Sequence, residues 1–564
     1  MARLEKLPRR ARTEVVRFSG ASRALALISP RSLAAIQELR LDIGLMRAST
    51  VEEAVRQAHA LRRAWDLGTL DLSADQRTSP PGVTDLSRLA GCAGLHTLSL
   101  SHSHITGVSA LAGCARLHTL SLSHSYTTVV SYNTVVSALA GCAKLHTLRL
   151  ANCQEGGDLS ALAAGCPALH TLTLKFRYTG VADAMDFSVL AGCAMLRTLE
   201  LSCSGLRDAS SLAGCALLRT LDLSGCNGLL DVSALVGCSA LHTLSLAVCQ
   251  SVDVSALSGC ATLHTLSLRQ TNLADVSALA GCAALHTLDL SECVCLADVS
   301  ALGNCAALHT LDLSYSRGVR DVSALAKCAA LHTLSLSRCN VRDVSALAAG
   351  CTALHELDLS HCEKVTDVSG FATLHTLTLF CCSGVTSISA LAGCKALHKL
   401  DLTATGITDV SALEDFLDDA RFGYRRSGPP TDMSWLTVLH TLDLSCCTRL
   451  KDVSALCDCD ALHTLNLRHT AVVDADMSVL ADCEGLRILD LQGCQNVTDM
   501  SWLADSPGLR TLNLSYCGGL RRVSALAKCE TLRTLSLKGC HGVIDRKKLR
   551  SACEDRAKTM ILLG

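Results

Sequence analysis

Histidine and cysteine recur in this chain at fixed spacing, and both residue types can bind metal ions or move protons. A histidine follows the first leucine of a short Leu-x-x-Leu-x-Leu unit at fourteen places between His96 and His463. A column of imidazoles could hold metal or respond to pH, but catalysis needs one distinct residue with a partner. Because arginine replaces histidine in the other five units, we interpret this position as a solvated strand entry.

The 33 cysteines follow the same period. Sixteen units have a pre-strand cysteine, three residues before the first leucine, and eleven have a turn cysteine, eight residues after it. A buried thiol acts as a small apolar group and a weak hydrogen-bonding group, so the turn cysteines are expected to help satisfy backbone amides. Cys446, Cys447, Cys457 and Cys459 have the wrong order for two zinc-binding pairs, so no metal ion is expected. So many free thiols favour a reducing compartment, and we expect a cytoplasmic protein.

Sequence motifs of common enzymes are absent. The chain has no phosphate-binding Gly-x-x-x-x-Gly-Lys-Ser/Thr loop and no Gly-x-Ser-x-Gly elbow, and the pair His355 and Glu356 lacks a second histidine four residues on. We therefore expect no catalytic residues and no cofactor. A net charge of −1 argues against nucleic acid as a partner, and no apolar run is long enough for a membrane span.

The repeated unit occurs nineteen times, and fourteen of the eighteen intervals between first leucines are 22 to 24 residues. In the unit that starts at 285, Leu288 and Leu290 alternate with polar residues, which predicts a half-buried strand. Leu296, Val299 and Leu302 then recur at every third residue, which predicts a 3₁₀-like return. Such a coil buries its apolar side only when coils stack on one another.

The sequence therefore predicts an α/β solenoid that is curved, with a parallel sheet on the concave face, 3₁₀ or short helical returns on the convex face, and helical caps. A basic tail and helical cap are expected over 1–66, an array of about 20 units over 67–542, and a C-terminal cap helix over 543–564. Insertions interrupt the array near 125–137, 176–187 and 413–432.

The pattern Leu-x-x-Leu-x-Leu-x-x-Asn/Cys resembles the leucine-rich-repeat signature over about 470 of the 564 residues. Residues 271–279 resemble the short repeats of the internalin and SDS22-like class, and 350–367 and 494–499 resemble the longer cysteine-containing repeats of F-box proteins. Leu-Ser-x-Cys-x-x-Val-x-Asp-Val-Ser-Ala-Leu is similar to repeats of parasitic flagellate protozoa, some of which are described as adenylate cyclase regulators. These resemblances leave open a substrate-recognition subunit of a ubiquitin ligase or a cyclase regulator.

Counted from the first leucine, unit positions three, five and seven should point out of the strand. Seven units from Asp222 onward carry aspartate at position five, a stripe that would attract a basic protein or peptide. Position eight varies most, so it is expected to carry specificity, and aromatic residues gather in the insertions. We predict a non-catalytic protein-binding scaffold of undetermined oligomeric state, with the following contact residues: Asp222, Asp289, Asp312, Asp358, Asp401, Asp443, Asp490, Tyr315, Arg338, Phe416, Phe422, Tyr424 and Arg425.

Overall fold

A computed structural model describes residues 69–71, 83–89, 94–101, 104–123, 132–153, 159–176, 187–202, 205–386, 391, 394, 396–407, 438–453, 456, 459–481, 483–555 and 561–563. Residues 1–66 and the insertion near 413–432, and with it Phe416, Phe422, Tyr424 and Arg425, lie outside this set. The chain divides into two compact units, unit 1 at Met1–Thr271 and unit 2 at Asn272–Gly564.

Unit 1 is built on a parallel sheet in which consecutive strands pair side by side. Its strands are β1 (Thr69–Asp71), β3 (Thr97–Ser101), β5 (Thr119–Ser123), β6 (Thr147–Cys153), β7 (Thr171–Phe176), β8 (Thr198–Ser202), β9 (Thr220–Asp222), β10 (Thr243–Ser245) and β11 (Thr265–Ser267). A separate parallel pair is formed by β2 (Val83–Asp85) and β4 (His104–Thr106).

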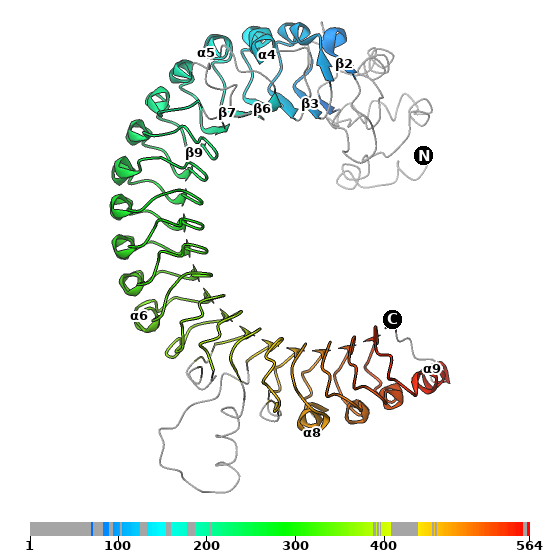
Figure 1. Ribbon diagram of the computed structural model, residues 1–564. Coiled ribbons are helices and arrows are strands. Elements are labelled where there is room, and N and C mark those ends of the chain that lie inside the picture. The colour runs from blue at the N-terminus through cyan, green and yellow to red at the C-terminus, as the bar shows by residue number, and fades with distance from the viewer. Residues whose placement is uncertain are drawn as a thin grey trace, which may run out of the picture. The chain divides into compact units, whose positions relative to one another are not determined.

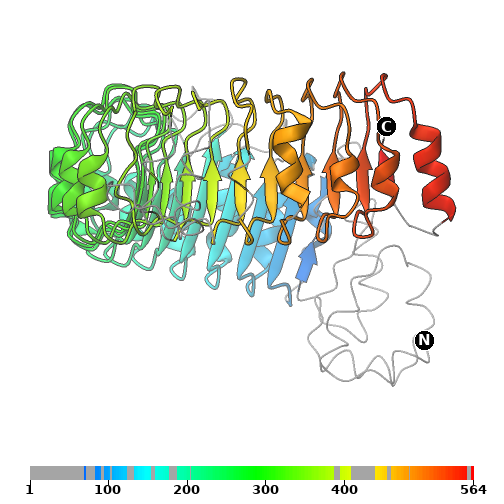
Figure 2. The same cartoon turned by 90° about the horizontal axis from the view of Figure 1, so that it is seen from below.

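Unit 2 continues the same construction with shorter strands, again all parallel (Figure 2). The strands are β12 (Thr287–Asp289), β13 (Thr310–Asp312), β14 (Thr333–Ser335), β15 (Glu356–Asp358), β16 (Thr376–Thr378), β17 (Lys399–Asp401), β18 (Thr441–Asp443), β19 (Thr464–Asn466), β20 (Ile488–Asp490), β21 (Thr511–Asn513), β22 (Thr534–Ser536) and β23 (Ile561–Leu563).

Short helices return each coil to the next strand. In unit 1 these are η2 (Leu86–Leu89), η3 (Val108–Gly113), α4 (Tyr132–Ala138), η4 (Leu139–Gly141), α5 (Ser160–Gly165), η6 (Ser188–Gly192), η7 (Ser210–Leu212), η8 (Ser233–Gly237) and η9 (Ser255–Gly259). In unit 2 they are η10 (Ser277–Gly281), η11 (Ser300–Asn304), η12 (Ser323–Lys327), α6 (Ser345–Gly350), α8 (Asp474–Met477), η17 (Ser478–Ala481), η18 (Ser501–Leu503), η19 (Ser524–Ala527) and α9 (Arg546–Asp555). Within each unit the strands lie on the concave side and these helices on the convex side (Figure 1), which confirms the predicted curved solenoid.

The apolar side of every coil is buried between its neighbours. In the coil that starts at 285, Leu288, Leu290, Leu296, Val299 and Leu302 are at most 1% exposed. The alternation of leucine in the strand and the spacing of three in the return thus place all five side chains in one core, as the sequence pattern predicted.

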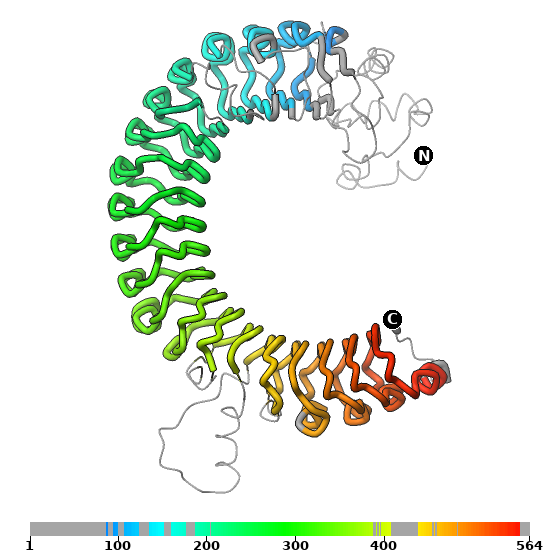
Figure 3. Tube along the Cα trace, viewed as in Figure 1, coloured from blue at the N-terminus to red at the C-terminus, as the bar shows by residue number. Residues whose placement is uncertain are grey.

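From β9 onward each strand ends in the same left-handed turn, and the coils follow the same path (Figure 3). Position eight has a positive φ in every unit from 218 to 532, and only Gly225, Gly493 and Gly539 are glycines there. The other eleven residues have φ between 54° and 65° and are Val248, Gln270, Glu292, Tyr315, Arg338, His361, Cys381, Ala404, Cys446, His469 and Tyr516. L-residues adopt this conformation at a cost of about 1 kcal/mol or more, so the surrounding coil must hold each of them in place.

Both sets of cysteines are core and turn residues, and their thiols donate to carbonyl oxygens of the preceding coil. The turn position also accepts from a backbone amide, as expected, since Oγ of Ser316 accepts from the Cys293 amide N–H at 3.0 Å. The turn cysteine Cys362 donates from Sγ to the carbonyl of Leu336 in the preceding coil at 3.1 Å. The pre-strand cysteine Cys328 does the same to Leu302 at 3.2 Å. Burial raises the pKa of Cys328 to about 12, so its thiol stays protonated and remains a donor.

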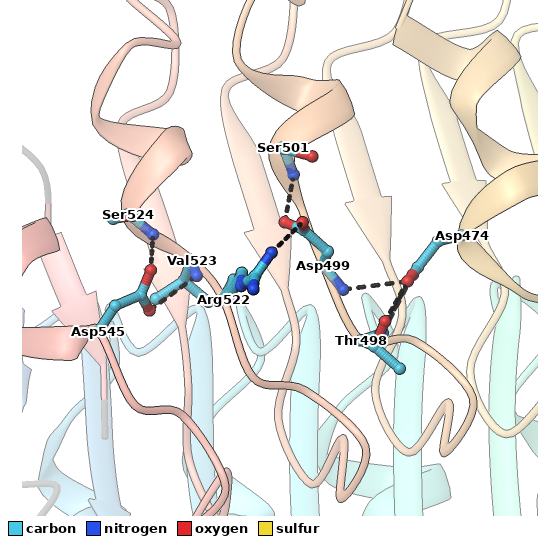
Figure 4. Close-up of polar contacts among 8 residues, drawn as sticks. All are labelled: Asp474, Thr498, Asp499, Ser501, Arg522, Val523, Ser524 and Asp545. Atoms are coloured by element: carbon cyan, nitrogen blue, oxygen red, sulfur yellow. Dashed lines mark hydrogen bonds and ion pairs between the residues drawn. The ribbon is translucent and has the colours of Figure 1, made fainter.

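A second turn held by a carboxylate lies where the chain enters the convex side of the coil. In the Asp-x-Ser motif at 298–300, the Ser300 amide N–H donates to Oδ1 of Asp298 at 2.8 Å, directly before η11. Near the C-terminal end, Arg522 occupies the position of the aspartate in this motif. The carboxylate of Asp545, from the following coil, accepts hydrogen bonds there from the amides of Val523 and Ser524 (Figure 4). This exchange keeps the start of η19 hydrogen-bonded although the local aspartate is missing.

The C-terminal end contains both a helix and a strand. The helix α9 occupies part of the predicted cap over 543–564, and β23 then pairs in parallel with β22. The capping role of this segment stays a prediction.

Candidate functional site

Each predicted position-five aspartate uses one oxygen to hold the turn that follows its strand. The amide N–H two residues on donates to Oδ1 of Asp289, Asp312, Asp358, Asp401, Asp443 and Asp490 at 2.8 to 3.0 Å. Asn466 and Asn513 form the same turn with Arg468 and Ser515 at 3.1 Å. A side-chain oxygen at position five can therefore hold this turn without a negative charge.

Strand register brings six of these seven aspartates onto the strand face of unit 2. Asp289 lies opposite Asp312 on adjacent strands, and Asp401 lies opposite Asp443. Asp358 and Asp490 occupy the same register position on β15 and β20. We call these six side chains the aspartate stripe: Asp289, Asp312, Asp358, Asp401, Asp443 and Asp490.

The seventh aspartate, Asp222, lies in unit 1 in a different electrostatic setting. Lys175 Nζ is 3.2 Å from Oε2 of Glu200 and 4.0 Å from Oδ2 of Asp222. Charges of both signs therefore meet on this face of unit 1, and Asp222 is separated from the aspartate stripe.

Position seven points outward in only part of unit 2, contrary to the expectation: Phe380 is 37% exposed, but several serines at this position are buried. Ser291, Ser360 and Ser445 are at most 8% exposed because the strand has already turned at this position. Position eight carries the outward side chains instead, at the left-handed residue of each turn.

Two predicted contact residues, Tyr315 and Arg338, belong to a row of four side chains on successive coils. The Arg338 guanidinium carbon lies 5.1 Å from the centre of the Tyr315 ring, and Nη2 of Arg338 lies 3.0 Å from Nε2 of His361. The His361 and Phe380 rings meet edge to face at 5.0 Å. Tyr315 and Phe380 are 45% and 37% exposed, so this aromatic–arginine row offers apolar surface to a partner.

Sequence reasoning did not select His361 and Phe380. Phe380 stands at position seven, where the neighbouring units carry Ser360 and Thr403, and that departure from a small hydroxyl residue was the available signal. His361 stands at position eight among many other residue types, so nothing in one sequence separates it from them.

The histidine position forms stacked columns on the strand-entry side of the sheet. Rings from His286 to His463 stack in unit 2 with centroids 4.2 to 5.2 Å apart. Nδ1 of His398 donates to the carbonyl of Ala396 at 2.5 Å, so these rings contact the backbone as well as one another. Burial and the neighbouring rings of His355 and His309 lower the pKa of His332.

Within the described residues no cluster of three or more His, Cys, Asp or Glu side chains could hold a metal ion. Likewise, no helix among them combines the length and the apolar character needed to cross a bilayer. The strand face offers carboxylates, which attract cations, and rings, which stack on cations or apolar groups.

Comparison with known proteins agrees with this architecture. A family model described as leucine-rich repeats (two copies) matches residues 330–373. No curated protein matches the chain. Arrays of such repeats typically present an extended binding surface rather than an enzyme site.

Solved structures similar to this chain include the mouse RP105/MD-1 complex, at 17% identity and a TM-score of 0.56 over 84% of this chain and 80% of that one. The TLR13–ssRNA13 complex is similar at 17% identity and a TM-score of 0.51, over 85% and 82% of the two chains. The internalin InlF of Listeria monocytogenes has 24% identity and a TM-score of 0.43 over 57% of this chain and 81% of that one. The repeat pattern and the fold are those of a curved leucine-rich-repeat solenoid with cysteines at repeated core and turn positions.

Proposed function

We propose that the chain is a non-catalytic scaffold that binds a protein partner with basic side chains on the strand face of unit 2. The observation that carries the proposal is the position of the aromatic–arginine row, which runs along the turns after β13 to β16, two of which directly follow Asp312 and Asp358 of the aspartate stripe. Two different kinds of contact are thus available over the same coils, charge attraction and ring stacking.

The aspartate stripe supports a basic partner. Its six carboxylates recur over the strands from β12 to β20, and 272–505 carries 29 Asp/Glu against 15 Lys/Arg, a net charge of −14. A field of one sign raises the association rate of an oppositely charged partner and favours its correct orientation.

The aromatic–arginine row supports a specific rather than a purely electrostatic contact. Aromatic and arginine side chains are the usual anchors of protein interfaces, because they bury much surface at little conformational cost. Arg338 already stacks on Tyr315, which shows that this ring accepts a guanidinium group. The ubiquitin-ligase and cyclase-regulator alternatives gain no support from any described contact.

The test compares proteins captured from source-cell extract by the wild type and by a variant with Asp358→Asn, Asp401→Asn and Asp443→Asn. Asparagine removes the charge and keeps the turn, as Asn466 and Asn513 do in the chain itself. We expect a partner with a basic surface to bind the wild type, and its capture to weaken at least tenfold in the variant. A second variant, Tyr315→Ala with Phe380→Ala, should lose the same partner.

The matched control removes three acidic charges elsewhere, with Asp460→Asn, Glu484→Gln and Asp505→Asn, all exposed residues that lie outside the strands. This control should capture the partner as the wild type does. Identical capture by all four proteins would refute the proposed surface, and equal loss in the control would reduce it to an effect of net charge.

A further inference from the structure

The last coils of unit 2 carry a net charge opposite to that of the rest of the unit. Residues 506–550 hold ten Lys/Arg against two Asp/Glu, a net charge of +8, directly after the stretch 272–505 with its net charge of −14. A basic surface of this density attracts polyanions, and three classes of these are an anionic membrane, a nucleic acid and an acidic protein.

An exposed isoleucine lies within this basic region. Ile544 is 76% exposed, the most exposed of the large apolar side chains among the described residues. Its amide N–H donates to the carbonyl of Arg521 at 3.0 Å, so the two residues lie side by side on adjacent coils. Lys547 and Lys548 follow in the first turn of α9, and both are exposed. We call Arg521, Ile544, Lys547 and Lys548 the basic end patch.

The backbone under the patch is held firmly. Asp545 points inward and accepts from the amides of Val523 and Ser524 at 2.9 and 2.8 Å (Figure 4). Leu549 of α9 is 1% exposed, and Arg546 donates from Nη2 to the carbonyl of Leu537 at 3.1 Å. Because the residues that follow it are fixed inward and its own amide N–H is bonded to Arg521, Ile544 is presented to the outside rather than left there by a loose loop.

We propose that the basic end patch docks onto an anionic lipid bilayer. Arg521, Lys547 and Lys548 contact the headgroups, and Ile544 enters the boundary between headgroups and acyl chains. The exposed apolar side chain favours a bilayer, whose acyl boundary can bury it, over the phosphates of a nucleic acid, which gain nothing from it. The acidic stretch 272–505 is repelled by the same lipids, so contact is restricted to the C-terminal end of unit 2.

The test measures co-sedimentation of the full chain with vesicles of phosphatidylcholine, with and without about 30% phosphatidylserine. We expect the wild type to bind only the anionic vesicles, and less so as salt is added. Lys547→Glu with Lys548→Glu should lower the partition coefficient at least tenfold, since each basic side chain near the surface contributes a factor of about five. Ile544→Ser should lower it about fivefold through lost insertion.

Matched controls have the same chemical change at other exposed sites of unit 2. Lys327→Glu with Lys364→Glu and, separately, Val294→Ser should leave partitioning within twofold of the wild type. Failure of the wild type to bind anionic vesicles, or equal loss in the controls, would overturn the proposal. Full binding by Ile544→Ser would do so as well, because the patch would then be a purely electrostatic site.

A second copy of the chain is the remaining occupant, and analytical ultracentrifugation separates it from a membrane. If the patch variants change the sedimentation of the protein alone and not its binding to vesicles, the patch joins two copies and the membrane proposal is wrong. None of these variants touches the aspartate stripe, so failure here leaves the proposed protein-binding surface intact, and the reverse also holds.

Discussion

The coils around β6 and β7 in unit 1 and the coil around β12 in unit 2 begin with the same Leu-His-Thr-Leu-x-Leu unit, yet their strands differ in length. β6 and β7 have seven and six residues, whereas β12 has three. In β7 position eight is Phe176 and is still part of the strand, but in the later coil it is Glu292 with φ 61°. The sheet is thus shortened wherever the chain turns left-handed at this position.

The later coils combine this turn with two further features. A side-chain oxygen at position five holds the turn from the strand side, and a thiol or hydroxyl at position nine donates to the preceding coil. Neither feature requires glycine, so position eight is free to carry tyrosine, arginine or histidine. The short-strand coil therefore gives up strand hydrogen bonds and gains an outward position that can vary.

The largest effect is expected from Gly493→Val. Gly493 has φ +74°, and a Cβ there would lie 2.3 Å from Nδ1 of His469. A β-branched residue should cost about 2–3 kcal/mol of unfolding free energy through backbone strain and this close contact. Chemical denaturation followed by circular dichroism measures the loss; a change below about 0.5 kcal/mol would mean that the turn is not required.

Removal of a turn thiol ranks next. Cys362→Ala should destabilise the protein by about 1–2 kcal/mol, because it opens a small cavity and leaves the Leu336 carbonyl with the Cys339 amide N–H, at 3.0 Å, in place of two donors. Cys362→Ser should cost less, since Ser316 at the same unit position donates to Leu290 at 2.8 Å. Equal losses in the two variants would show that the thiol acts by volume alone.

Glycine at position eight should act in opposite directions in the two kinds of coil. Val248→Gly relieves a β-branched residue at φ 65° and should stabilise the protein by about 0.5 kcal/mol. Phe176→Gly puts glycine into strand β7 and should destabilise it by about 1 kcal/mol. Thermal unfolding of both variants gives the comparison, and shifts of the same sign would contradict two distinct coil types.

The smallest effect on stability per site is expected from lowering the pH. Hydrogen bonds from Ser255 and Ser323 lower the pKa values of Asp253 and Asp321 below 3.8. A depressed pKa in the folded state contributes stability above the unfolded value, and this stability is lost as pH falls through the folded value. Below pH 4 we therefore expect a drop of a few degrees in Tm.

Amide hydrogen exchange compares a coil that lacks this aspartate with two coils that have it. The 3₁₀ helix η3 follows Gly107, which has no side chain to cap it, so its protection should change less with acid than that of η9 and η12. Uniform loss of protection across all three helices would point to global acid unfolding instead.

The sequence was sufficient to predict the strands, the 3₁₀ returns and the core. A leucine period of two indicates a strand and a spacing of three indicates a 3₁₀ return, and nineteen repetitions of the unit leave little ambiguity. It was not sufficient for the left-handed turn, because eleven non-glycine residues at position eight carry no glycine signal. The buried serines at position seven follow from the same turn and were wrongly expected to face outward.

The candidate site was only partly within reach of the sequence. The aspartates could be aligned because strand register follows the repeat, and Tyr315 and Arg338 could be selected as variable residues in a constant frame. Their contacts with His361 and Phe380 depend on side-chain directions at the turn, which spacing does not give. The opposite net charges of 272–505 and 506–550 could be counted from the sequence, but they become visible only when the sequence is divided at residue 506.

The pairing of β17 with β18 shows that the array can accept inserted sequence between two coils. The first leucines of the coils that contain β17 and β18 are 42 residues apart. The two strands nevertheless pair in register, Lys399 with Thr441 and Asp401 with Asp443, and the Leu402 amide N–H donates to the backbone carbonyl of Asp443 at 2.7 Å. The two coils join as if the extra residues were not there. This junction is therefore a natural acceptor for foreign sequence: a reporter domain, a protease site or a newly duplicated exon placed there should leave the flanking coils in register.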